Sequence, residues 1–202
     1  MTNKMPSKKP VPPLTHAVIS YKKPARLVIE HLSDSQKVTE ATIIKKFFGA
    51  LKDKKQRTFS DLIQTPEKEE WPDFYAKEDG INWAIELVEL VVPEHAKQWS
   101  KKRDYASRSF PIRVDDARHL LENTISRKIK KRYSPLSNHK ILLLIYDLRN
   151  GGFATSITDS VGLTNAHKVL QTNKHYFNEV WYVYPLAEQD QGIILKVWPF
   201  QE

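Results

Sequence analysis

The chain of 202 residues contains no cysteine. Disulfide bonds and thiolate metal sites are therefore excluded, and this composition fits a cytoplasmic protein. The sequence also lacks a window of about eighteen consecutive apolar residues, so it predicts no transmembrane helix and no membrane partner. The basic N-terminus is not followed by an apolar segment and is not interpreted as a signal peptide.

Several motifs that carry common chemistry are missing as well. The sequence has no GxxxxGK[ST] and no GxGxxG, which argues against a P-loop nucleotide-binding protein and against a dinucleotide-binding protein. It has no GxSxG either, so a hydrolase with that nucleophile motif is not supported. Its seven histidines form no HExxH pair or other close ligand spacing. A zinc site is therefore not expected.

What the chain has in excess is positive charge. The formal net charge is +8 and the sequence pI is about 9.5. Lysine and arginine gain affinity for nucleic acid by releasing its counterions, so this charge suits a nucleic-acid partner, with DNA as the first expectation. The plainer interpretation is a basic soluble protein that binds no anion.

Hydrophobic residues make up 40% of the chain, which is enough for one compact core. Residues 1–13, rich in lysine and proline, are expected to form a disordered basic tail, and residues 14–202 a single α/β domain. Segment 94–113 is polar and basic without a clear period. Periodicity and turn residues predict helices over 33–55, 114–133 and 163–177, and strands over 57–64, 72–78, 81–92, 140–148, 179–186 and 192–200.

This order predicts a mixed sheet flanked by helices, with a hairpin across Asp79-Gly80. Strands disfavour acidic side chains, yet Asp73, Glu86 and Glu89 lie on the two strands of that hairpin. A buried carboxylate costs free energy unless a partner neutralises it. A divalent metal ion is one such partner.

The order of elements over about residues 34–147, with Pro72-Asp73 on one strand and Glu86 within AIELVEL on the next, resembles the PD-(D/E)XK nuclease superfamily. The resemblance implies a restriction-endonuclease-like αβββαβ core, here extended by a C-terminal helix and two strands. It also implies that Asp73 and Glu86 bind Mg²⁺ or Mn²⁺, which fits the preference of Mg²⁺ for carboxylate oxygens. A third acid often comes from the first core helix in this superfamily, and Glu40 is the matching residue.

The chain departs from the superfamily pattern at one position. The lysine expected two residues after Glu86 is replaced by Val88. Lys128 or Lys131, on the following predicted helix, could supply the missing cation. Glu89 points to the face opposite Glu86 if the strand is regular, and an ion pair with a lysine explains it equally well.

The run RKIKKRY at the end of that helix concentrates basic residues. It is expected to contact a phosphate backbone, although basic residues also complement the C-terminal end of a helix dipole. The residues expected to bind nucleic acid are Arg127, Lys128, Lys130, Lys131, Arg132 and Tyr133.

Three functions remain open at this point. The first is a metal-dependent phosphodiesterase acting on DNA, with catalytic residues Asp73, Glu86, Glu40, Lys128 and Lys131; such nucleases often work as homodimers. The second is a catalytically lapsed nuclease-like domain that binds nucleic acid or a protein partner. The third is an unrelated α/β interaction protein.

Overall fold

The computed structural model describes residues 36–55, 57–66, 69, 71–91, 114–131, 136–147, 160–184 and 193–199. The expected basic tail and segment 94–113 lie outside these residues. The described helices are α1 (Gln36–Lys55), α3 (Val114–Lys130) and α5 (Ser160–Thr172). The described strands are β1 (Ser60–Gln64), β2 (Phe74–Glu78), β3 (Ile81–Glu89), β4 (His139–Tyr146), β5 (Glu179–Tyr184) and β6 (Ile193–Trp198).

The strands form one mixed sheet in the order β1-β2-β3-β4-β5-β6. The outer pairs β1-β2, β2-β3 and β5-β6 are antiparallel. The central pairs β3-β4 and β4-β5 are parallel, because α3 and α5 each carry the chain back across the sheet. The predicted α/β class, the mixed sheet and the order of its elements are therefore confirmed.

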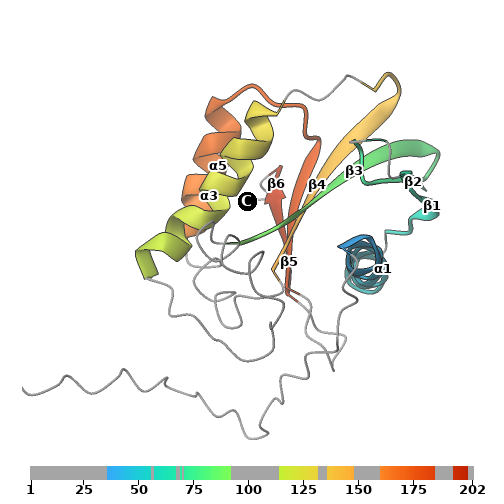
Figure 1. Cartoon of the computed structure of the whole chain (residues 1–202), viewed down its shortest axis with the longest axis horizontal. Helices are drawn as coiled ribbons and strands as arrows, with labels where there is room; N and C mark the ends of the chain where they lie inside the picture. Colours follow the sequence, from blue (N-terminus) through green and yellow to red (C-terminus); the bar gives the residue numbers. More distant parts are fainter. Residues whose placement is uncertain are drawn as a thin grey trace, which may run out of the picture.

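Helices cover both faces of the sheet, so the described residues form three layers (Figure 1). α3 and α5 pack on one face, through Leu121, Ile125 and Ala166 against alternate residues of β3, β4 and β5. α1 packs on the opposite face through Ile44, Phe47 and Leu51. Successive side chains of a strand point to opposite faces, so each residue of the central strands can be assigned to one of the two layers.

The hairpin between β2 and β3 turns at Asp79-Gly80, as predicted. Both residues have positive φ angles, 48° for Asp79 and 78° for Gly80. A two-residue hairpin turn of this kind needs positive φ at both central positions, which aspartate tolerates and glycine adopts freely. The turn fixes the register in which Phe74 lies opposite Ile85.

Helical spacing predicts one core face on α1, made by Val38, Ala41, Ile44, Phe47, Phe48 and Leu51. This prediction is wrong at Val38, which is 53% exposed. Ile43 is buried instead, since the packed face of α1 is shifted around the helix by its contact with the sheet. The other predicted core residues of α1 are buried or partly buried in the same cluster.

A charged cluster joins the α1 side of the sheet to the loop before β1. Arg57 forms a bidentate ion pair with Glu78, with N–H···O distances of 2.5 and 2.7 Å, and donates to Glu179 at 2.9 Å. Trp181 and Lys196 also donate to Glu179. Burial alone raises the pKa of Glu179, but these hydrogen bonds outweigh it and lower the pKa below the usual value.

We expect Arg57→Gln to lower the free energy of unfolding by about 3 kcal/mol, because it leaves the buried carboxylate of Glu78 without its cation. Urea unfolding measures the change. The matched control is Lys77→Gln, which breaks an ion pair with Asp61 whose side chains are 55% and 57% exposed. Equal stability of the two variants would contradict a stabilising role for the cluster.

Candidate functional site

The structure places Asp73 and Glu86 side by side at the junction of β2 and β3. The amide N–H of Asp73, the residue before β2, donates to the carbonyl oxygen of Ile85 at 3.0 Å. The amide of Leu87 donates to Oδ2 of Asp73 at 2.6 Å. These two hydrogen bonds hold Asp73 against β3 on both sides of Glu86 in the sequence, and the charge of Glu86 acts on the Asp73 carboxylate.

Two lysines from the end of α3 reach the same carboxylate. Nζ of Lys128 lies 2.6 Å from Oε1 of Glu86, and Nζ of Lys131 lies 3.5 Å from it. Glu86 is only 2% exposed, whereas the Lys131 side chain is 44% exposed. Lys128 is therefore the main cation for a carboxylate that the sheet has removed from water.

Glu40 approaches this group from α1. It is 6% exposed, in the second turn of the helix, and accepts a hydrogen bond of 2.7 Å from Gln36 one turn earlier. Burial raises the pKa of Glu40, and the nearby charge of Glu86 raises it further. The five residues predicted to be catalytic, which are 91 positions apart at their extremes, thus form one electrostatically coupled group.

Asp73 shows this coupling most clearly. Burial raises its pKa to about 6, and the charges of Glu86 and Glu40 add to the shift. The hydrogen bond from Leu87 and the charge of Lys128 act in the opposite direction without cancelling it. Desolvation and like charges therefore make the ionised form of Asp73 costly at neutral pH.

The donor set suits a hard divalent cation only in part. Asp73 and Glu86 offer carboxylate oxygens from neighbouring strands, and Mg²⁺ is commonly held by one or two carboxylates with water and phosphate oxygens. Within the described residues, however, no group of three or more histidine and acidic side chains is placed to hold a metal ion. Asp73 and Glu86 are therefore the two carboxylates available to a metal ion, and Glu86 already forms an ion pair with Lys128.

The surroundings of Val88 are unsuitable for the lysine that the superfamily pattern has at this position. Val88 lies in the apolar cluster between the sheet and the helices α3 and α5. A charged group there would be removed from water among aliphatic side chains. Lys128 approaches Glu86 from α3, over the same face of the sheet.

Glu89 belongs to the set of β3 side chains that point to the face opposite Glu86. It pairs in register with Tyr146, which belongs to the core on the α1 side, so Glu89 faces the layer opposite Glu86. The predicted separation of these two carboxylates onto opposite faces agrees with this register.

The basic run at the end of α3 is only partly described. Arg127, Lys130 and Lys131 are exposed at this end, and Lys131 reaches Glu86. Arg132 and Tyr133 lie outside the described residues. Phosphate contact by this run stays a prediction.

Sequence reasoning missed two parts of the site. Gln36 precedes Glu40 by one helical turn, and this spacing is the signal that could have indicated their hydrogen bond. Tyr75 and His139 come from strands two places apart in the sheet, and their rings lie 5.5 Å apart between centroids. No local pattern relates these two residues.

Comparison of the chain with protein-family models, with curated proteins and with solved structures finds no match. No helix in the described part of the chain is both long and apolar enough to cross a membrane.

We expect Asp73→Asn to stabilise the protein at pH 8 by about 2 kcal/mol, and by about a third as much near pH 4.5. The pKa of Asp73 is higher in the folded state than in the unfolded state, so the folded state binds more protons between the two values. The wild type therefore loses stability as the pH rises through 6, and the neutral asparagine does not.

Urea unfolding at the two pH values measures this difference, with Asp53→Asn on the exposed side of α1 as the control. If Asp73→Asn changed the stability equally at both pH values, the pKa of Asp73 would not be raised in the folded state.

Lys128→Met should lower the free energy of unfolding by about 3 kcal/mol, because a buried carboxylate loses its closest cation. Lys131→Met should change it by less than about 1 kcal/mol, since its longer ion pair is partly in water. Thermal and urea unfolding of both variants test the ranking. A reversed ranking would mean that Lys131, not Lys128, neutralises Glu86.

Proposed function

We propose that the protein is a metal-dependent phosphodiesterase acting on DNA, with a restriction-endonuclease-like core. The observation that carries the proposal is the convergence of Asp73, Glu86 and Lys128 from two strands and a helix, with Glu40 from a second helix. Asp73 and Glu86 are the two residues that the resemblance to the nuclease motif rests on, and they are the two that converge here.

The electrostatic cost of this arrangement supports a function for it. A protein gains no stability by placing Asp73 where burial and two neighbouring carboxylates raise its pKa to about 6. Strongly perturbed ionisable groups concentrate at functional sites, where the perturbation serves binding or chemistry. A divalent cation would turn the mutual repulsion of these carboxylates into attraction.

Each residue then has a definite role. Asp73 and Glu86 would hold Mg²⁺ or Mn²⁺, and Leu87 fixes the Asp73 carboxylate through its backbone amide. The bound ion would polarise the phosphoryl group and lower the pKa of an attacking water. Lys128 orients Glu86 and, once the metal shares that carboxylate, can donate to a phosphate oxygen.

The remaining residues support this core. Glu40, whose pKa is raised by burial, would accept or return a proton at the site. Exposed Arg127, Lys130 and Lys131 supply positive charge beside it, where a DNA backbone would pass.

A specific observation favours a second candidate function, a lapsed nuclease domain that binds nucleic acid. The 2.6 Å ion pair between Lys128 and Glu86 supplies a cation from within the chain. A site neutralised in this way could keep its fold and its basic surface without binding a metal. Metal binding separates the two functions.

We expect Mg²⁺ or Mn²⁺ to raise the melting temperature of the wild type, since a ligand that binds only the folded state stabilises it. The same ions should support cleavage of supercoiled, linear or single-stranded DNA. Asp73→Asn and Glu86→Gln should each lose the metal-induced shift and reduce cleavage by at least about a hundredfold, because each removes a metal ligand.

Glu122→Gln is the control, since it changes a carboxylate on α3 that pairs with His119 away from the site. DNA binding without a metal-induced shift and without cleavage would establish the lapsed domain. Cleavage that survives in Asp73→Asn or in Glu86→Gln would overturn the assignment of that residue as a metal ligand.

A further inference from the structure

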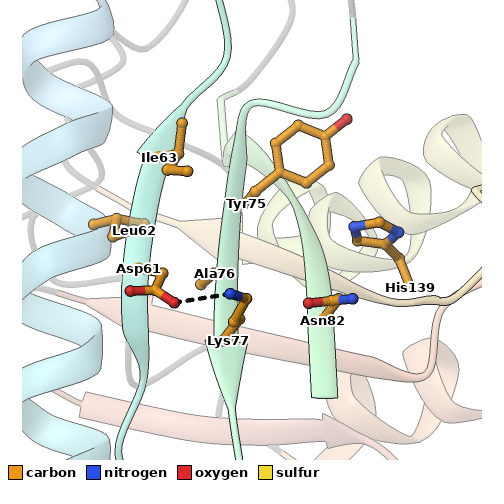
Figure 2. Close-up of a pocket in the computed structure, with 8 residues that line it drawn as sticks. All are labelled: Asp61, Leu62, Ile63, Tyr75, Ala76, Lys77, Asn82 and His139. Atoms are coloured by element: carbon orange, nitrogen blue, oxygen red, sulfur yellow. Dashed lines mark ion pairs between the residues drawn. The ribbon is translucent and has the colours of Figure 1, made fainter. Parts of the chain in front are cut away.

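A hollow of about 400 Å³ opens on the surface of the sheet. Side chains of β1, β2, β3 and β4 line it (Figure 2). Its lining residues are Asp61, Leu62, Ile63, Tyr75, Ala76, Lys77, Asn82 and His139. Its volume lies within the range of small-molecule binding sites.

Two rings and an amide form one side of this hollow. Figure 2 shows Tyr75 and His139 from β2 and β4, with Asn82 of β3 beside them. The rings meet edge to face at an angle of 61°. Asn82 pairs in register with His139 on one side and with Lys77 on the other, so these side chains share one face of the sheet.

The helices leave this part of the sheet open. The apolar cluster beneath α3 and α5 takes its strand residues from β3 to β6 and none from β1 or β2. Ile63, which pairs with Tyr75, is 60% exposed, and Tyr75 itself is only half-buried. An apolar side chain and an aromatic ring are thus presented to solvent next to an amide that can both donate and accept hydrogen bonds.

The hollow and the carboxylate site are built on the same two strands, β2 and β3. Tyr75 follows Asp73 by two residues, so the two residues lie about 7 Å apart along the chain. Asn82 and Glu86 share a face of β3, separated by the small side chain of Ala84. A DNA strand held by its phosphate at Asp73 and Glu86 would therefore bring its neighbouring nucleotide over Tyr75.

We propose that this hollow binds an unpaired nucleobase next to the phosphodiester that the site cleaves. The inference rests on the proposed function and narrows its substrate to single-stranded DNA, or to duplex DNA with an unpaired nucleotide. A base can stack on Tyr75, as bases commonly do on aromatic side chains in single-strand-binding proteins, only when it is not paired inside a duplex. The amide of Asn82 contacts the edge of the base, and Lys77, at the rim, is held by Asp61 at 3.1 Å.

The test is DNA binding in EDTA, so that its outcome does not depend on cleavage. Fluorescence anisotropy compares a labelled single-stranded oligonucleotide with a blunt duplex of the same sequence. Tyr75→Leu should weaken single-strand binding about tenfold and leave duplex binding unchanged, because stacking is lost while phosphate contacts remain. Tyr75→Phe should retain the wild-type affinity.

Tyr176→Leu is the matched control, since Tyr176 is a 55% exposed tyrosine that follows α5 and is not part of the hollow. An oligonucleotide with 5-iodouracil adds a direct readout, because irradiation should crosslink it to the peptide that contains Tyr75. Single-strand affinity that is equal in the wild type and Tyr75→Leu, or a crosslink elsewhere in the chain, would overturn the inference.

The two proposals fail separately. Tyr75-dependent binding without metal-dependent cleavage would keep the nucleobase site and remove the phosphodiesterase. Cleavage that depends on Asp73 but is indifferent to Tyr75→Leu and to strandedness would keep the phosphodiesterase and overturn the nucleobase site.

Discussion

The ion pair between Lys128 and Glu86 is the contact on which the arrangement of this site depends. Glu86 lies on a strand between two layers of helices, where an unpaired carboxylate would cost several kcal/mol. Its cation comes from α3, 42 residues further along the chain. The carboxylate therefore constrains where the end of α3 can pack, and this in turn brings the charge of Lys128 to bear on Asp73.

The two charged clusters show two ways of burying acidic groups. On the α1 side, Arg57, Lys196 and Trp181 satisfy Glu179, and its pKa falls below the usual value. Around Asp73, where α1, β3 and α3 all contribute charged groups, Lys128 is shared among nearby carboxylates, and the pKa values of Asp73 and Glu40 stay raised. The first cluster stabilises the fold. The second retains an excess of negative charge, which a stabilising cluster does not need and a cation-binding site does.

Features that depend on neighbouring residues or on a repeating pattern along the chain could be predicted from the sequence. The Asp79-Gly80 turn fixes the hairpin, and the hairpin brings the start of β2 next to Ile85, so the proximity of Asp73 and Glu86 could be predicted without knowing the rest of the fold. The packed face of α1 was misjudged at Val38, because a tertiary contact decides which of two overlapping helical faces is buried. The choice between Lys128 and Lys131 needed the rotation of α3 against the sheet, which periodicity does not supply.

The irregularity in β1 has a consequence for assembly. The register of β1 against β2 shifts between Ser60 and Ile63, and Asp61 adopts a left-handed φ of 51° within the strand. A regular edge strand presents aligned amides that can recruit a strand from another molecule, and a bulge disrupts that alignment. Within the described sheet, the bulge therefore makes β1 a poor template for pairing with a strand of a second copy.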